Sequence, residues 1–403
     1  MKASKYILAS IFALAFATLA NAQTTIHITG STAYRSAVHA AILNILAPTT
    51  TFGYSSTTLG ASNQAIFTGT TVTGSIPVII KTSFSGSVDG LLVLTKGLPV
   101  PDAAIGVAGG WLVNSTPQSV APGTASVPAT YDPAVTADAS FSDSFQGSTI
   151  ASSPALVGAN GYAAGVVGVV PFEWVRNAGS PATITNVTSL LAQAALAGGV
   201  PLTLFSGLPA DSSTNVMVFG RDSDSGTRLE TFAETGYGIL KSPVQYQPLP
   251  VGGATITAIN PWPAQTTDGI SYRLGHEGFN SGSGVAGALD ATGSSTAANN
   301  PGWVIGYLGI SDAATAVTGG GTALPFNGVT YSTGAVQNGT YSFWSYEHLY
   351  YPSSFVGTTG QTVVDQLAAN VHNVATTSAG IQVTTMNVGR SVEGGVITLG
   401  NPY

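Results

Sequence analysis

Short apolar runs alternate with polar turns along most of the chain. Residues 25–29 alternate polar and apolar side chains, which predicts a strand, and residues 33–46 place their apolar side chains on one helical face. The same reasoning predicts further strands at 78–80, 165–172, 216–220 and 304–310, and further helices at 188–197, 363–375 and from 227 to about 237. Strands that alternate with helices are typical of α/β architecture.

Three segments depart from this regular alternation. Residues 98–133 are rich in Pro, Gly, Ser and Thr, which predicts an irregular insertion. The run 165–172 is almost entirely apolar or Gly and is typical of a strand buried in a parallel sheet. Residues 343–351 are rich in aromatic side chains, and we expect them to pack in a core or at a hinge rather than to bind sugars.

The N-terminus has the three parts of a cleavable secretory signal. Two lysines form a positive region, residues 7–19 form an apolar one, and Ala20-Asn21-Ala22 provides the small side chains that signal peptidase requires. The apolar run is shorter than the roughly 20 residues that span a bilayer. We therefore expect residues 1–22 to be removed. The chain has no cysteine, so the usual lipid-attachment site after a signal peptide is also missing.

Charged residues make up only 7% of the chain. Loss of the two signal-peptide lysines would leave nine basic and eighteen acidic residues. Such a chain lacks the basic surface that binds nucleic acids or anionic membranes. The hydrophobic content of 44% indicates folded cores rather than disorder. We expect a soluble monomer in the periplasm, with secretion or the cell surface as alternative destinations.

Three places share one design, in which an apolar strand leads into a turn of Gly, Ser and Thr and then into a helix. They are residues 30–32, 85–87 and 225–227. A helix N-terminus exposes unpaired N–H groups and carries partial positive charge, and hydroxyls beside it add further donors. Three such ends would hold an oxyanion with little net charge. Each turn alone is equally consistent with an ordinary helix cap that binds nothing.

Arg221 lies four residues before Ser225 and sets the third turn apart. Its guanidinium is a fixed cation whose planar fork suits a grip on two oxygens. The same side chain could instead form a surface salt bridge with Asp222 or Asp224. Composition alone leaves both interpretations open.

The segment 221–227, Arg-Asp-Ser-Asp-Ser-Gly-Thr, resembles the Arg-x-Asp-Gly-Ser-Gly-Thr motif of periplasmic phosphate-binding proteins, the solute receptors of phosphate ABC importers. Residues 28–34 look like that family's first Gly-x-Thr-Phe turn, and residues 85–87 look like its Ser-Gly-Gly turn. Ser142-Asp143 is similar to its Ser-Asp motif. Weaker similarities at 282–287 and 305–307 follow in the same order, so the resemblance extends from about residue 26 to 310.

The resemblance implies an α/β, type II periplasmic-binding-protein-like fold with a ligand cleft between two lobes. Lobe one would comprise residues 23–172 and 340–403, and lobe two residues 173–339. The implied ligand-binding residues are Thr32, Ala33, Ser85, Asp143, Arg221, Ser225, Gly226 and Thr227. The implied partners are inorganic phosphate or a related oxyanion and the membrane subunits of an ABC importer, with no cofactor.

Two of these implied roles have clear physics. Arg221 would supply the only formal positive charge. Asp143 would accept a hydrogen bond from a protonated anion, which would favour hydrogen phosphate over sulfate. The sequence also departs from the family pattern, because Ala33 replaces a Phe and Ser223-Asp224 replaces Asp-Gly. The second change moves the carboxylate that would brace Arg221 by one position.

Other chemistries find less support in the sequence. Residues 282–287 fit G-x-G-x-x-G, but they lie late in the chain rather than after the first strand, where a dinucleotide site requires them. The five histidines lack metal-ligand spacing, and no Gly-x-Ser-x-Gly elbow occurs. We expect neither a metal site nor an enzyme. The alternative to a receptor is a secreted surface or adhesive protein, rich in Gly, Ser and Thr, that keeps the fold without the transport ligand.

Overall fold

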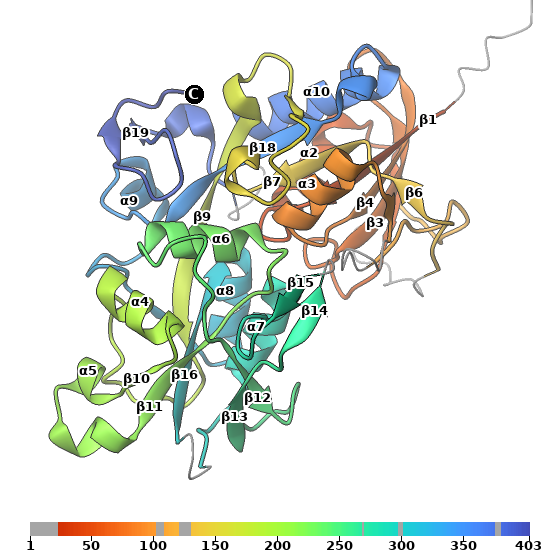
Figure 1. The fold of residues 1–403 in the computed structure, drawn as a ribbon. Helices are drawn as coiled ribbons and strands as arrows, with labels where there is room; N and C mark the ends of the chain where they lie inside the picture. The colour runs from red at the N-terminus through yellow and green to blue at the C-terminus, as the bar shows by residue number, and fades with distance from the viewer. Residues whose placement is uncertain (1–22, 102–108, 121–129, 268–269, 297–300, 375–379) are drawn as a thin grey trace, which may run out of the picture.

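The computed structural model describes residues 23–101, 109–120, 130–267, 270–296, 301–374 and 380–403 (Figure 1). Its main feature is a mixed sheet of twelve strands in the order β10-β11-β16-β9-β18-β7-β1-β4-β3-β2, with β17 beside β9 and β8 beside β18. These strands are β1 (Thr24–Gly30), β2 (Thr51–Tyr54), β3 (Gln64–Thr70), β4 (Pro77–Ser83), β7 (Ala139–Ser142), β8 (Val157–Gly158), β9 (Val166–Arg176), β10 (Val200–Pro201), β11 (Asn215–Phe219), β16 (Gly302–Gly309), β17 (Thr322–Leu324) and β18 (Trp344–Tyr351).

Helices cover this sheet along its length. They are α2 (Arg35–Ile45), α3 (Ser87–Lys96), α4 (Ser189–Leu196), α5 (Thr203–Ser206), α6 (Gly226–Glu234), α7 (Gly282–Asp290), α8 (Ile310–Thr318), α9 (Thr333–Gln337) and α10 (Thr359–Asn373). Two-stranded sheets outside the main one pair β5 (Pro99–Val100) with β6 (Val135–Thr136), β12 (Tyr246–Leu249) with β13 (Ala258–Pro261), β14 (Gln265–Thr267) with β15 (Ile270–Tyr272), and β19 (Val388–Gly389) with β20 (Thr398–Leu399). The α/β class expected from the sequence is therefore confirmed.

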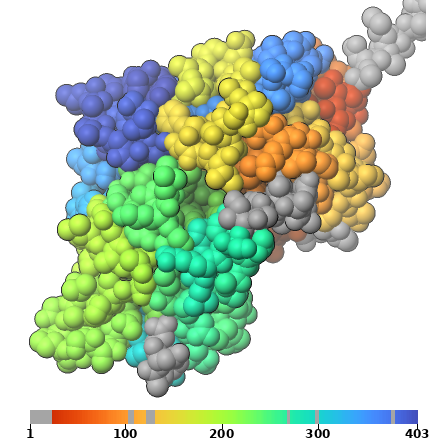
Figure 2. Space-filling view, viewed as in Figure 1, coloured from red at the N-terminus to blue at the C-terminus, as the bar shows by residue number. Residues whose placement is uncertain are grey.

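The strand β9 runs from one half of the sheet into the other. Its residues up to Pro171 pair with β18, and its residues from Phe172 onward pair with β16 and β17. The partner strands therefore change between Pro171 and Phe172. Figures 1 and 2 show a two-lobed outline, in which the N-terminal and C-terminal parts of the chain form one lobe and its middle part forms the other.

One buried core is shared between the two lobes, and another lies within lobe two. A large buried cluster that includes Phe141 and Trp344 extends from lobe one into lobe two. A second cluster, which includes Val285 and Leu308, lies between β16 and the helices α7 and α8 of lobe two. We propose that lobe one comprises residues 23–172 and 340–403 and that lobe two comprises residues 173–339. The names lobe one and lobe two refer to these ranges.

The expectation that residues 165–172 belong to a parallel strand is wrong. β9 pairs antiparallel with β16, β17 and β18. Parallel pairs do occur, between β1 and its neighbours β4 and β7 and between β11 and β16. The run is apolar because β9 lies in the middle of the sheet, where ten of its eleven residues are buried. Burial on both faces, rather than parallel pairing, explains the pattern.

The first predicted helix begins later than expected. Helix α2 starts at Arg35, and its N-cap residue Tyr34 makes no side-chain capping bond. The Ser31 hydroxyl instead accepts a hydrogen bond from the Tyr34 amide at 3.3 Å, within a turn that precedes the helix. Gly30 opens this turn with φ +112°, and a side chain there would overlap the Phe141 carbonyl. Ser31 and Thr32 therefore lie in the turn and not at the helix N-terminus.

The described part of the predicted insertion 98–133 contributes buried side chains. Trp111 and Leu112 are fully buried, and the Trp111 indole donates to the Val135 carbonyl at 2.9 Å. Parts of this insertion and the expected signal peptide, residues 1–22, lie outside the described residues. Within the described ranges, no helix combines the length and apolar character that crossing a membrane requires.

Candidate functional site

The segment from Arg221 to Thr227 joins β11 to α6 and carries most of the predicted site. β11 is an apolar strand whose last four residues are buried, so it fixes where the turn begins. The Ser225 hydroxyl caps α6 by accepting a hydrogen bond from the Arg228 amide at 3.3 Å. This N-cap uses the residue type that helix starts prefer. The local sequence thus places Gly226 and Thr227 in the first turn of α6, where backbone N–H groups are unpaired.

Arg221 is a buried cation whose hydrogen bonds all go to uncharged oxygens. Its side chain donates from Nη1 to the Thr32 hydroxyl at 3.1 Å, from Nε to the Phe279 carbonyl at 3.0 Å and from Nη2 to the Asn280 carbonyl at 3.1 Å. Only 1% of the residue is exposed. Among the described residues, no carboxylate forms an ion pair with it. Arg221 therefore does not form the surface salt bridge with Asp222 or Asp224 that the sequence allowed.

Asp143 follows β7 and lies between the first turns of α3 and α6. Its Oδ1 accepts a short hydrogen bond from the Ser87 hydroxyl, and its Oδ2 accepts one from the Thr227 hydroxyl at 3.2 Å. The Asp143 amide also donates to the Ser87 hydroxyl oxygen at 3.2 Å. Burial raises the pKa of the Asp143 carboxyl, whereas the Ser87 hydrogen bond, the Arg221 charge and the Thr227 hydrogen bond act in the opposite direction. The carboxyl therefore binds a proton more readily than an exposed Asp does.

Gly226 permits this close approach of lobe one to α6. A Cβ on Gly226 would overlap Asp143 Oδ1 and would lie 2.7 Å from the Ser87 Cβ. The Asp143 carboxylate thus lies against the first residue of α6, where the helix dipole favours negative charge. An internal anion occupies the helix end at which the sequence resemblance puts an oxyanion.

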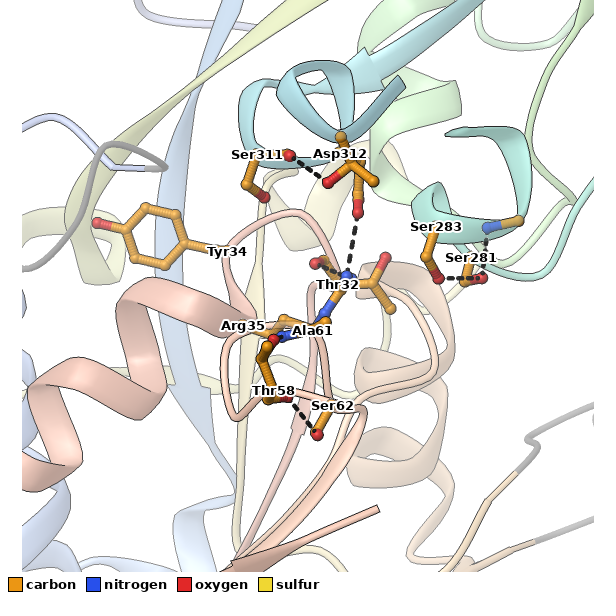
Figure 3. A network of polar contacts seen from close by, with 12 residues as sticks. Thr32, Tyr34, Arg35, Thr58, Ala61, Ser62, Ser281, Ser283, Ser311 and Asp312 are labelled. Carbon is orange, nitrogen blue, oxygen red and sulfur yellow. Dashed lines mark hydrogen bonds and ion pairs between the residues drawn. The ribbon is translucent and has the colours of Figure 1, made fainter. Parts of the chain in front are cut away.

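A second carboxylate repeats this arrangement at α7. A Cβ on Gly282, the first residue of α7, would overlap Asp312 Oδ2. Asp312 lies on α8 in lobe two, and its Oδ1 accepts a hydrogen bond from Arg35 Nη2 of lobe one at 3.0 Å. Arg35 also donates to the Thr32 carbonyl at 2.6 Å. Figure 3 shows this group, with Thr32 of the β1–α2 turn and Arg35, the first residue of α2, on one side and Asp312 on the other.

Ala33 packs directly against lobe two. A Cβ on Gly309, at the start of α8, would lie 2.8 Å from the Ala33 Cβ. The site therefore has no room for the Phe that stands at this position in the phosphate-binding family that the sequence resembles. The small residues at 33 and 309 fit each other, which explains the departure from the family pattern in physical terms.

Ser85 lies apart from the Asp143 cluster. Its hydroxyl has no hydrogen-bond partner among the described residues and lines a cavity of about 210 Å³. Asp89, Asp222 and Asp224 also line this cavity. Burial raises the pKa of Asp222, and the nearby Arg221 opposes that rise. The second predicted turn thus contacts Asp143 through Ser87, and Ser85 instead faces an acidic cavity.

Two further buried carboxyls lie behind Asp143. Glu230 of α6 and Glu347 of β18 are both fully buried, and neither forms an ion pair with a described residue. Burial raises the pKa of both groups well above the usual range for Glu. The nearby Asp143 acts in the same direction on both groups.

The structure brings most of the predicted residues together and adds several that the sequence did not indicate. Asp143, Gly226 and Thr227 are in contact, and Arg221 reaches Thr32 across the lobe boundary. Arg35, Ser87, Arg228 and Asp312 were missed. Ser87 lay in a recognised turn, and the scarcity of basic residues was a usable signal for Arg35 and Arg228. Among the described residues, no group of three or more His, Asp and Glu side chains could hold a metal ion.

No protein-family model matches the chain, and no curated protein matches it either. Several solved structures do match the chain. One from Clostridium perfringens, described as a phosphate ABC transporter substrate-binding protein with bound phosphate, has a TM-score of 0.47 and 11% identity and covers 89% of this chain and 99% of its own. An ABC-type phosphate transport receptor from Vibrio cholerae has a TM-score of 0.43 and 13% identity over 85% of this chain and 93% of its own. PstS from Borrelia burgdorferi has a TM-score of 0.36 and 14% identity over 86% of this chain and 97% of its own.

Proposed function

We propose that the chain is an exported solute-binding protein that captures an oxyanion, most simply phosphate, between its two lobes for an ABC importer. The anion would lie near the N-termini of α3 and α6, within reach of Arg221, Thr227 and Thr32. The environment of Arg221 is the main support for this proposal, because Arg221 is a buried cation whose hydrogen-bond acceptors are all neutral. Burying a charge without a direct ion-pair partner is costly, and a bound anion would offset that cost.

The role of Asp143 follows from its two hydroxyl partners. Ser87 and Thr227 hold the carboxyl in one orientation between the two lobes. A bound phosphate would have to displace Asp143 from the α6 N-terminus or share a proton with it. We propose that hydrogen phosphate donates to Asp143 when it enters, which sulfate, having no proton at neutral pH, cannot do. Capture would thus exchange the internal carboxylate for the external anion at the same helix end.

A surface or adhesive protein that has kept the fold without the ligand is the second candidate. One observation favours it, namely that internal carboxylates already lie against the first residues of α6 and α7. Asp312 also pairs with Arg35 across the lobes, so the lobes hold together without an external anion. In this second case, neither phosphate nor sulfate would bind.

Calorimetric titration of variants tests the role of Arg221. Arg221→Gln should weaken phosphate binding about 100-fold, since a charge-assisted hydrogen bond contributes up to about 3 kcal/mol and 1.4 kcal/mol is a factor of ten. Arg273→Gln is the control. Arg273 is exposed, so this substitution removes one positive charge from the surface. Equal affinities for the two variants would overturn the assignment. Unfolding curves for both variants establish that each one is folded.

A further inference from the structure

The turn between Arg221 and α6 separates two cavities of opposite character. Asp222 and Asp224 line the acidic cavity that also contains Ser85. Ser223 and Ser225 line a second cavity, of about 440 Å³, on the other side of the turn. Residues 222 and 224 of this turn therefore line one cavity, and residues 223 and 225 line the other.

The second cavity has apolar walls from both lobes. Val88 and Ile150 belong to lobe one, and Leu229, Phe232 and Leu240 belong to lobe two. Ile150 and Leu240 are 60% and 96% exposed, so they stand at the edge where the cavity meets solvent. A volume of this size lies within the roughly 300–1,000 Å³ that small-molecule sites occupy. An inorganic oxyanion would neither fill it nor cover its walls.

Arg228 gives this cavity a positive charge. The residue is 5% exposed. It donates to the Arg221 carbonyl at 3.0 Å and to the His276 carbonyl at 2.6 Å, and it contacts His276 Nε2 at 3.0 Å. Burial lowers the pKa of His276 to about 4, so that ring is neutral near pH 7. None of these acceptors carries a negative charge.

Part of the Arg228 guanidinium remains unused. Three hydrogen bonds leave two of the five N–H donors of an Arg side chain free. The guanidinium also lies 5.2 Å from the centre of the Phe232 ring, which itself lines the cavity. The exposed Lys241 lines the cavity too and adds a second positive charge. A cation next to an aromatic ring and apolar walls suits a ligand with one acidic group and an apolar body.

We propose that this cavity is a second binding site, for a small organic anion such as an aryl or alkyl phosphate monoester or carboxylate. The acidic group would bind at Arg228, and the apolar body would lie between Ile150, Leu229 and Leu240. The site is separate from the one at Asp143 and does not depend on phosphate binding there. Because both lobes line it, a ligand in this cavity stabilises the closed arrangement over an open one.

Calorimetric titration with phenyl phosphate tests this proposal, with saturating inorganic phosphate present to occupy the first site. The wild-type mature chain should bind phenyl phosphate under these conditions. Leu240→Glu places a negative charge at the mouth of the cavity, where it repels the anionic ligand. It should weaken binding on the order of fivefold. Leu190→Glu is the matched control, because Leu190 on α4 is 77% exposed and lies outside the cavity. Arg228→Gln should weaken binding about tenfold or more.

The outcomes separate this proposal from the proposed function. Failure of the wild-type chain to bind phenyl phosphate would overturn the second site, whatever inorganic phosphate does alone. Equal affinities in Leu240→Glu and Leu190→Glu would overturn it too. Leu240 is almost fully exposed, so this comparison stands even where Arg228→Gln fails to fold. Loss of inorganic phosphate binding alone would leave the second site intact.

Discussion

Gly226 and Asp143 lie so close together that no side chain fits between them. The carboxylate of Asp143, from lobe one, rests against the first residue of α6, from lobe two. The contact joins a negative charge to the positive end of a helix dipole across the lobe boundary. The site depends on a glycine here for space rather than for backbone freedom, because Gly226 is not among the residues with positive φ.

Replacement of Gly226 by Ala should push the lobes apart. The added methyl group overlaps Asp143 Oδ1, so Gly226→Ala should lower the free energy of unfolding by about 1–3 kcal/mol and weaken phosphate binding. Gly287→Ala is the control, because Gly287 lies within α7 with no heavy atom near its would-be Cβ. That variant should gain about 0.5–1 kcal/mol. Urea unfolding measures both, and equal shifts in the two variants would refute the steric account.

Asp143→Asn should remove the discrimination between phosphate and sulfate. An amide cannot accept hydrogen bonds with both of its terminal atoms, so one of the hydroxyls of Ser87 and Thr227 would lose its acceptor or have to turn. The neutral side chain would no longer repel sulfate. Competition titrations with the two anions measure the ratio of affinities. Asp224→Asn, on the other side of the turn, is the charge-matched control, and an unchanged ratio in Asp143→Asn rules out the acceptor role.

The ion pair between Arg35 and Asp312 should contribute strongly to holding the lobes together. Both side chains are nearly buried, with 3% and 6% exposed. Asp312→Asn leaves Arg35 buried without its counter-ion and should cost about 3 kcal/mol of unfolding free energy. Asp138→Asn is the comparison, because Asp138 pairs with His27 and its side chain is 28% exposed. It should cost less than about 1 kcal/mol, and a similar loss in both variants would contradict the account.

His39 should make the protein sensitive to acid. The ring is buried, and its nitrogens contact the Leu59 carbonyl and the Thr82 hydroxyl, both at 2.9 Å. Burial lowers the pKa of His39 to about 3, from 6.5. The fold therefore favours the neutral ring, and this contribution is present above pH 6.5 and is lost as the pH falls from 6.5 toward 3.

The measurement is urea unfolding of the wild type and of His39→Gln across this pH range. The wild type should lose on the order of a few kcal/mol more than the variant between about pH 7 and about pH 4. His372→Gln, at a partly exposed position on α10, should keep the wild-type dependence. Parallel curves for wild type and His39→Gln would show that His39 does not carry the effect.

The sequence predicted the fold class and most of the turns of the site, because apolar runs and Gly-Ser-Thr turns are local patterns. It misjudged β9, since an apolar run reports burial on both faces but not the direction of the neighbouring strands. It also started α2 too early, because the Ser31 hydroxyl accepts from the Tyr34 amide in a turn before the helix. A Ser that caps a helix and a Ser that closes a turn before a helix have the same local sequence pattern.

Long-range contacts explain what the sequence could not indicate. Arg35 meets Asp312 from 277 positions away, and Ser87 meets Asp143 from 56 positions away. No spacing rule connects such residues, because the first pair depends on how the two lobes meet and the second on how lobe one folds. Ser85 and Ser87 occupy the same turn, and only the fold shows that Ser87 contacts Asp143 while Ser85 faces the acidic cavity.

Titration of the ligand-stripped mature chain with inorganic phosphate tests the central claim most directly. The chain would be unfolded, dialysed and refolded, and then titrated in a calorimeter with phosphate in the presence and absence of excess sulfate. We expect phosphate to bind at one site near Arg221 and Asp143, with little competition from sulfate. Absence of binding heat with phosphate at several temperatures would contradict the claim and would favour a protein that keeps its lobes closed with Asp143 and Asp312 alone.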